Sequence, residues 1–404
     1  MATTTFLYHT MRVRGYRYLR FEVAGNVIRH HIRLPRHRRR CRGCNARWHE
    51  LVLDGRFERT FLGLPIGKRK QEVVLHGHYQ LCRRCGKRLR EPIRFAEGGR
   101  RYVRSLASYV VYLCEKATIK DVSDVVGLGW DSVKEVFKNH LRLKLRKRTL
   151  SEVRRIAVDE FAVRKGQQYL TVVLDLDSGQ VLWSAEGRSA DALLPFLDRL
   201  KRCRAPLEAV ALDMWPAYSL AVKSVFPYVT IVYDPFHIVK LVNRAIDNAQ
   251  RDLAAQIPKT IRCRRGLRFV LLRARENLSL RGNSLLTDLM RINQPLYKAY
   301  LLKEQLRTAL WSFSSKRIAH RFLDQWIDQA EATGINSFRQ LAKTLNNNRH
   351  AILAWYEHQI STGPLEGLNN KIKTLKRQAY GFRDMEYFKL RLAFIHSSIS
   401  RFPG

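Results

Sequence analysis

The segment from residue 151 to about 238 most narrows the folds open to this chain. Short apolar runs there have the length and composition of buried strands, and helical periodicity appears between the later ones. The predicted elements, in chain order, are strands at 155–163, 168–176 and 180–186, a helix at 189–202, a strand at 208–213, a helix at 216–226 and a strand at 229–234. Such alternation predicts an α/β domain.

Three consecutive strands followed by helix, strand, helix and strand is the order of an RNase H-like core. From about 236 to 355 the sequence is mostly helical and rich in Leu, Arg and Lys. The simplest interpretation is a large helical insertion at 239–355, which divides the core into 151–238 and 356–404.

Three carboxylates are placed where such a core could use them. Asp159 lies inside the first predicted strand, Asp213 ends the fourth, and Glu366 follows the breaker pair Gly363-Pro364 at the start of a Lys-rich helical segment. Side chains at the carboxyl ends of strands line the sites of α/β folds. Two strand acids and a helix acid can hold divalent ions against a phosphodiester, and all-oxygen ligands suit magnesium, with manganese as the alternative.

Neighbouring polar residues need separate interpretations. Glu160 alternates with Asp159 and should face the other side of the sheet. Asp175 and Asp177 flank Ser178-Gly179 and are expected in a turn. Asp234 ends the fifth strand and His237 follows one helical turn later, so both are candidate near-site residues.

Seven cysteines include two Cys-x-x-Cys pairs, Cys41 with Cys44 and Cys82 with Cys85. Each pair supplies two thiolates on one tight turn, and a structural zinc site needs four ligands. The long gap between the pairs predicts a hairpin, so residues 1–98 are expected to form a zinc-binding, β-rich domain.

Residues 99–150 are expected to be helical. After a first helix, the stretch from Thr118 to Phe137 shows two amphipathic helices around a Gly-containing turn, as in a helix-turn-helix. Asp131 or Ser132 is suited to cap the second helix, and Ser132 and Lys134 are candidate DNA contacts. The run 141–148 is expected to be a basic linker.

The chain has 404 residues and a formal net charge of +39, with 35 basic and 12 acidic residues in positions 1–150 alone. Such a surface attracts polyanions, and its basic residues are spread over several folded segments, which favours nucleic acid over a membrane surface. No secretory signal or apolar run of transmembrane length is visible, so a cytoplasmic protein associated with nucleic acid is expected.

Several segments together support a resemblance to a known family. They are Val158-Asp159-Glu160-Phe161, Asp213-Met214-Trp215-Pro216-Ala217-Tyr218, Asp234-Pro235-Phe236-His237, Glu366-Gly367-Leu368-Asn369-Asn370-Lys371-Ile372-Lys373 and Ala379-Tyr380-Gly381-Phe382-Arg383. With them the chain resembles the DDE transposases of bacterial insertion sequences, most of all the ISL-three family. One departure is Pro235, where an arginine is common in the family.

The resemblance implies a catalytic triad of Asp159, Asp213 and Glu366 that binds two metal ions. It implies a zinc finger and helix-turn-helix that bind the element ends, hydrolysis to a 3′-OH, strand transfer into target DNA, and a dimer or larger assembly on double-stranded DNA. It further implies that Lys373 contacts DNA near the active site. Lys376 and Arg377 extend that basic face.

Two other interpretations stay open at this point. One is a regulatory DNA-binding protein whose core is inert, and the other is an RNase H-like nuclease such as a junction resolvase. Three tryptophans of the predicted insertion are expected to pack in its core, with stacking on a displaced base as the alternative. They are Trp311, Trp326 and Trp355.

Overall fold

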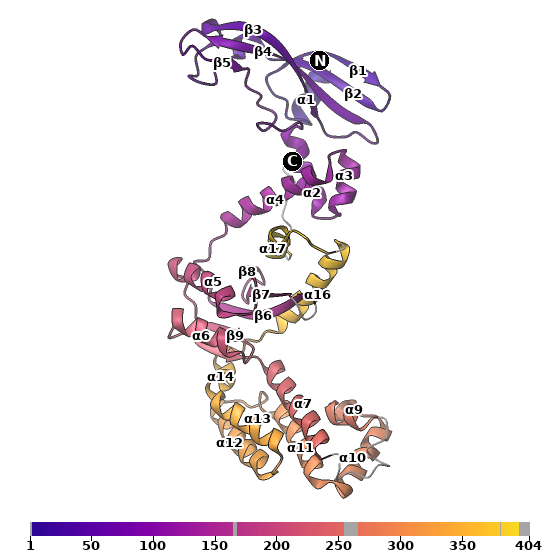
Figure 1. Ribbon diagram of the computed structural model, residues 1–404, viewed down its shortest axis with the longest axis vertical. Helices are drawn as coiled ribbons and strands as arrows, with labels where there is room; N and C mark the ends of the chain where they lie inside the picture. Colours follow the sequence, from indigo (N-terminus) through magenta and orange to yellow (C-terminus); the bar gives the residue numbers. More distant parts are fainter. Residues whose placement is uncertain (1, 165–167, 254–265, 380, 396–404) are drawn as a thin grey trace. The chain divides into compact units, whose positions relative to one another are not determined.

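The computed structural model describes the chain except for residues 1, 165–167, 254–265, 380 and 396–404 (Figure 1). It divides into two compact units, one formed by the described residues up to Lys147 and one beginning at Arg148. Each unit is described separately below.

The first unit is built on a five-stranded sheet with the order β1-β2-β4-β3, in which β5 also pairs with β4. β3 and β4 form the long antiparallel hairpin predicted between the two cysteine pairs, whereas β2 and β4 are parallel. The strands are β1 (Arg17–Ala24), β2 (Val27–Arg33), β3 (Leu51–Leu62), β4 (Lys70–Cys82) and β5 (Arg88–Arg90), and helix α1 (Ala2–His9) precedes them.

Three helices complete this unit: α2 (Arg104–Cys114), α3 (Ile119–Val126) and α4 (Trp130–Arg146). The Thr118 side chain caps α3 in a reciprocal capping box with Asp121, and Gly127 ends that helix in the left-handed conformation, with φ of 70°. Because Val133, Phe137 and Leu141 recur at intervals of four residues and are fully buried, α4 continues to Arg146. The predicted basic linker at 141–148 is therefore wrong for most of its length.

The second unit contains a five-stranded sheet with the order β10-β9-β6-β7-β8. β7 pairs with β6 and β8 in antiparallel orientation. On the other side of β6, β9 pairs with β6 and β10 pairs with β9, both in parallel. The elements are β6 (Arg155–Arg164), β7 (Gln168–Asp175), β8 (Val181–Glu186), α5 (Ala190–Arg202), β9 (Ala209–Leu212), α6 (Pro216–Val225) and β10 (Thr230–Tyr233). All seven were predicted from the sequence, with ends that agree within two residues.

Helices cover both faces of this sheet. Ile156, Val158 and Val210 point into a core shared with α5 and α6. Ala157, Ala211 and Val172 point into the opposite core, which is closed by α16 (Gly363–Gln378) and α17 (Met385–Ala393). The alternation of side chains along β6 thus decides which residues face α16.

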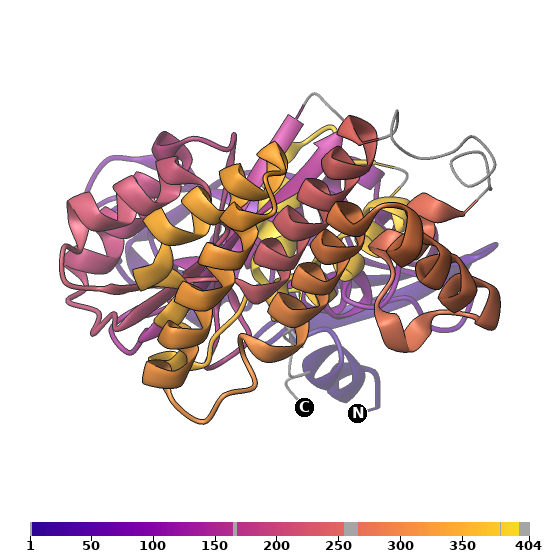
Figure 2. The same ribbon diagram turned by 90° about the horizontal axis from the view of Figure 1, so that it is seen from below.

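A helical block separates β10 from α16 in the chain. α7 packs against α11 and α13, and Figure 2 shows these helices side by side. The described helices are α7 (Pro235–Asp252), α9 (Leu267–Leu272), α10 (Leu280–Ile292), α11 (Gln294–Ala309), α12 (Lys316–Ala332), α13 (Asn336–Asn347), α14 (Arg349–Leu353) and α15 (Trp355–His358). Trp326 is fully buried and donates its indole N–H to the Leu302 carbonyl at 2.8 Å, while Trp311 and Trp355 pack at the margins of the cores. The expected core role is thus met by Trp326, whereas Trp311 and Trp355 are only partly buried.

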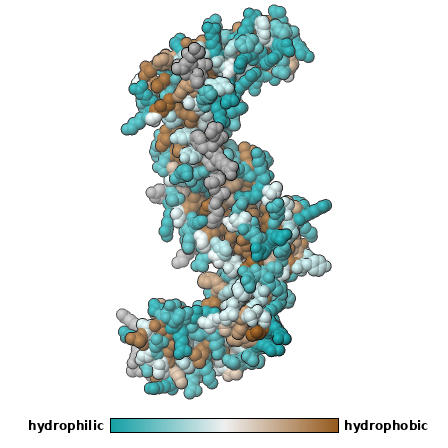
Figure 3. Space-filling model, turned by 180° about the vertical axis from the view of Figure 1, so that it is seen from behind, coloured by the Kyte–Doolittle hydropathy of each residue, from teal (hydrophilic) through white to brown (hydrophobic). Residues whose placement is uncertain are grey.

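The surface is mostly polar on the face that Figure 3 shows, where hydrophobic residues form small scattered groups. None of the described helices is long and apolar enough to span a membrane.

Candidate functional site

Asp159 lies on β6, the middle strand of the sheet, and its side chain is on the face covered by α16. It accepts a hydrogen bond from the Glu160 backbone N–H at 2.7 Å and one from the Asn369 side-chain amide at 3.2 Å. Burial raises the pKa of Asp159, and the negative charge of Asp213 adds to that effect, although the hydrogen bonds and His237 oppose it. Burial and the charge of Asp213 disfavour the ionised form of Asp159, and a nearby cation would stabilise that form.

Asp213 follows β9 directly and sits at the same level as Asp159. The parallel register pairs Ala157 with Ala211, so each aspartate lies two residues beyond that pair and on the same face. Asp213 is about half exposed and accepts the Met214 backbone N–H at 2.6 Å. The register therefore places Asp159 and Asp213 on the same face of the sheet, at neighbouring strands.

His237 connects Asp213 to a second, buried aspartate. Its Nε2 lies 3.7 Å from an Asp213 oxygen, and its Nδ1 lies 3.3 Å from an Asp234 oxygen. Burial lowers the pKa of His237, but the hydrogen bond to Asp234 and the charge of Asp213 raise it by more, so the net shift is upward. His237 and Asp234 are the two residues that the sequence indicated as candidate near-site residues.

Asp234 also fixes the start of α16. Its carboxylate is 2% exposed and accepts the Thr362 hydroxyl at 2.7 Å and the Thr362 backbone N–H at 3.4 Å. Thr362 is the residue before α16, so one buried carboxylate holds both His237 and the beginning of the helix that carries Glu366. Nothing in the local sequence indicates the Thr362 contact, since 128 positions separate the partners.

Glu366 lies in the first turn of α16, one turn before Asn369. Leu365, Leu368 and Ile372 anchor the helix on the sheet, and Glu366 is exposed beside this buried stripe. Asn369 touches Asp159, and Glu366 precedes Asn369 by one turn on the same side of α16. That Glu366 completes a set with the two aspartates remains a prediction.

The three carboxylates do not form a closed set of ligands in the structure. Within the described parts of the chain, the one group of three or more potential ligands whose donor atoms all lie within 4.8 Å of one another is formed by cysteines. By chemistry the acids still fit magnesium, because carboxylate oxygens are its preferred protein ligands. Asp159, Asp213 and Glu366 are the residues that would hold it.

Glu160 faces away from Asp159, as predicted, but it is closer to the site than the sequence suggested. Burial raises the pKa of Glu160, and the charges of Asp159 and Asp213 raise it further, whereas a hydrogen bond from Tyr218 opposes them. Tyr218 also shares a 2.8 Å hydrogen bond with Thr171. Alternation along β6 correctly predicted which face of the sheet Glu160 occupies. The polar group that Glu160, Tyr218 and Thr171 form depends on how α6 and β7 pack, so the sequence did not indicate it.

The basic residues of α16 differ in their surroundings. Lys373 and Arg377 are exposed, whereas Lys376 donates a hydrogen bond to the Val163 carbonyl and lies 5.6 Å from the Phe161 ring centroid. Lys376 therefore packs on β6 in this structure, and its predicted contact with DNA would compete with that packing.

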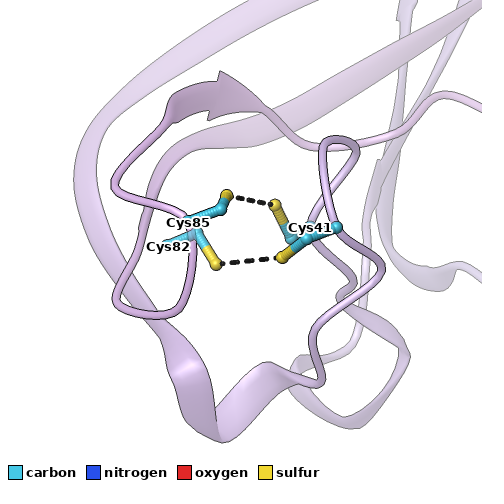
Figure 4. A group of neighbouring side chains, drawn as sticks. Cys41, Cys82 and Cys85 are labelled. Atoms are coloured by element: carbon cyan, nitrogen blue, oxygen red, sulfur yellow. Dashed lines mark hydrogen bonds between the residues drawn. The ribbon is translucent and has the colours of Figure 1, made fainter.

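Four cysteines of the first unit, Cys41, Cys44, Cys82 and Cys85, form a compact cluster (Figure 4). The sulfur of Cys41 lies 3.6 Å from that of Cys85, and the sulfur of Cys44 lies 3.6 Å from that of Cys82. These distances are close to the ~3.8 Å edge of a tetrahedron whose Zn–S bonds are ~2.3 Å. The donor set therefore fits zinc, which these four residues would hold.

Electrostatics in the cluster favour a thiolate at one position. Burial raises the pKa of Cys41, but hydrogen bonds from the Cys44 and Gly43 backbone N–H groups and from neighbouring thiols lower it to about 7. A low thiol pKa near a tight turn is the property that a metal ligand needs.

The helix-turn-helix prediction has its expected elements in α3 and α4. One detail is wrong: α4 begins at Trp130 with Gly129 as N-cap, and no side chain caps it. Asp131 lies inside the first turn, where its charge can still interact favourably with the helix dipole. Ser132 and Lys134 lie in the first two turns, and Lys134 stacks on Trp130 at 5.2 Å.

The chain is similar in sequence to known transposases. Residues 156–392 match the model of a transposase family, the DDE transposases of the ISL3 type. The chain is 36% identical over 366 residues to the transposase of insertion sequence element IS1001 from Bordetella parapertussis, with 88% of each chain covered. It is 34% identical over 259 residues to the transposase of IS1557 from Mycobacterium tuberculosis, covering 58% of each chain.

Among solved structures, the Drosophila P element transposase strand transfer complex aligns with a TM-score of 0.38 and 11% identity, over 72% of this chain and 91% of that one. This score is too low to establish a shared fold. The chain belongs to the ISL3 family of insertion-sequence transposases, as the family match and the IS1001 relative show. The family resemblance predicted from the sequence is confirmed.

Proposed function

We propose that this transposase cuts DNA at the ends of its element and joins the resulting 3′-OH to target DNA, using Asp159, Asp213 and Glu366. The observation that carries the proposal is the matched placement of Asp159 and Asp213 on neighbouring parallel strands, with α16 lying across them. Family membership supplies the reaction class, DNA cleavage and joining.

The topology of the second unit supports an RNase H-like core. Three antiparallel strands come first in the chain, and two parallel strands extend the sheet from β6. The helical block from α9 to α15 would be its insertion, although the proposed boundary between 238 and 239 falls inside α7. The four-part division into 1–98, 99–150, the split core and the insertion remains a proposal.

The proposed site residues would have different roles, according to the elements on which they lie. Asp159 and Asp213 would be metal ligands on the rigid sheet, and Glu366 would complete the set from α16. A bound pair of divalent ions would supply an activated attacking oxygen and stabilise the leaving oxygen of an in-line displacement. His237 and Asp234 would orient Asp213 and the start of α16.

The first unit would recognise the element ends. Four thiolates holding zinc would fix the turns at the base of the β3–β4 hairpin, and α3 and α4 would place Ser132 and Lys134 against double-stranded DNA. Lys373, Lys376 and Arg377 would contact DNA near the acids. Holding two ends together requires a homodimer or a larger assembly.

The test compares wild type with Asp159→Asn, Asp213→Asn and Glu366→Gln on a duplex carrying the inverted repeat that flanks the gene. Each variant should lose roughly a thousandfold or more in magnesium-dependent cleavage, because a lost ligand removes several kcal/mol of charge stabilisation. End binding, measured by fluorescence anisotropy, should stay within about twofold of wild type.

Cleavage at the wild-type rate in any of the three variants would reject that residue as part of the triad. A wild-type protein that binds the ends but does not cleave them with magnesium or manganese would instead be a DNA-binding regulator with an inert core.

A further inference from the structure

Arg188, an arginine that follows β8, lies over two aromatic rings. The Arg188 guanidinium carbon lies 4.9 Å from the ring centroid of Tyr169 and 5.9 Å from that of Trp215. Trp215 comes two residues after Asp213, and its backbone N–H donates to the Asp213 carbonyl at 2.7 Å. Because β8 runs in the same direction as β6 and β9, Arg188 lies at the edge of the sheet where β9 ends before Asp213.

The surroundings of Arg188 explain why it takes this position. The Gly187 backbone N–H donates to the Tyr169 carbonyl at 2.8 Å, which fixes the chain immediately before the arginine. The positive charge of Arg188 lowers the pKa of Glu160, although burial dominates and raises it, so the two groups attract each other. β7, the end of β8 and the loop after β9 all contribute to the placement.

Arg188 is exposed and keeps its hydrogen-bonding edge open. Among the ion pairs of the described residues, none joins Arg188 to a carboxylate within 4.0 Å. Stacking on aromatic faces uses the flat surface of a guanidinium and leaves its N–H groups directed outward in the ring plane. A guanidinium held in this way can donate two parallel hydrogen bonds to an oxyanion.

We propose that Arg188, held by Tyr169 and Trp215, binds a backbone phosphodiester of the DNA strand beside the bond that is cut or joined. The inference rests on the proposed function, because the acids at Asp159 and Asp213 define where that strand lies. Arg188 would position the strand, and it takes no part in bond making or breaking.

A neutral phosphate analogue tests the contact directly. Duplexes carrying the flanking inverted repeat would be made with a single methylphosphonate at each position around the cleaved bond, and their binding to the full-length protein measured by competition. For wild type, one position should weaken binding roughly tenfold, because a charge-assisted contact is lost.

Arg188→Ala should bind the unmodified duplex roughly tenfold more weakly and lose its sensitivity at that one position. Arg188→Lys should recover part of the affinity, since it keeps the charge without the planar fork. The matched control is Arg202→Ala. Arg202 is also exposed, but it ends α5 at the opposite edge of the sheet, and this variant should respond to every methylphosphonate as wild type does.

Thermal unfolding of each variant separates a folding defect from a lost contact. If Arg188→Ala keeps the wild-type sensitivity at every methylphosphonate position, the inference is rejected, and cleavage by wild type would still support the proposed function. Cleavage is measured separately on the unmodified duplex, so a failure of the proposed function appears in that assay, whereas a failure of the Arg188 contact appears in the binding comparison.

Discussion

At the residue scale, the site was predictable where a strict period applies and unpredictable where tertiary contacts decide. Period-two alternation placed Asp159 and Glu160 on opposite faces, and strand ends placed Asp213 and Asp234 at one edge. No pattern indicated that Thr362 would bond Asp234, because contacts between distant segments follow from packing. The triad itself remains a prediction, as do its metal ions.

The Asp234–His237 pair gives stability a defined pH dependence. Burial raises the pKa of Asp234, but hydrogen bonds from His237 and Thr362 lower it by more, whereas the pKa of His237 is raised overall. The aspartate contribution is present above its unfolded pKa of about 3.9 and is lost as pH falls through the lower folded value. The histidine contribution is present below about 6.5 and is lost as pH rises through the higher folded value.

Asp234→Asn should therefore destabilise the protein by about 1–3 kcal/mol between about pH 4 and 6.5, and by less as pH increases above that range. Urea unfolding in magnesium-free buffer at several pH values measures this difference. Asp198→Asn, an exposed aspartate on α5, is the control and should show no such trend. A cost of Asp234→Asn that is unchanged from pH 5 to 8.5 would contradict the assignment.

At the element scale, the sequence predicted the existence of helices and strands more accurately than their first residues. α4 starts at Trp130, ahead of the expected polar cap, and extends through Leu141 into the expected linker, because burial of its apolar stripe outweighs the local preferences of a basic run. The strands of the second unit were easier to predict, since continuous apolar runs bounded by turns leave few alternative assignments of secondary structure.

One buried lysine of the helical block binds the end of α9 to α11. Lys303 is 1% exposed and donates to the carbonyls of Leu271 and Arg273 at 2.9 and 2.6 Å, and it pairs with Glu304 at 2.8 Å. Lys303→Met keeps the aliphatic bulk but leaves those acceptors without their donor. The expected cost is about 2 kcal/mol of unfolding free energy, measured by urea titration.

Lys298→Met is the matched control for this experiment, since Lys298 is exposed on the same helix. It should change stability by less than about 0.5 kcal/mol. Equal effects of the two substitutions would show that the buried donor is not what holds α9 against α11.

At the scale of the whole molecule, the region around the cysteines differs from the second unit in its apolar packing. The second unit has two large apolar cores around one sheet, whereas the cysteine cluster at the base of the β3–β4 hairpin has only a few apolar neighbours, Ala46, Leu51 and Leu89. A small core of this kind usually depends on a metal ion.

Removal of zinc should therefore unfold the cysteine-containing region while leaving the second unit folded. Purified protein should contain about one zinc per chain, and Cys41→Ser or Cys85→Ser should lose it together with end binding. Zinc content is measured by metal analysis, and folding by circular dichroism. Cys203→Ser is the control, because Cys203 is exposed and lies outside the cluster; full zinc retention in Cys41→Ser would refute the four-thiolate site.

The contact between Asp234 and Thr362 also bears on how this chain can change over evolution. More than a hundred residues separate the two in the chain, yet the Thr362 hydroxyl and backbone N–H both donate to the Asp234 carboxylate, at 2.7 and 3.4 Å. An inserted segment whose two ends lie close together does not strain the domain that carries it. The segment between Asp234 and Thr362 can therefore vary in length without moving the start of the helix that carries Glu366.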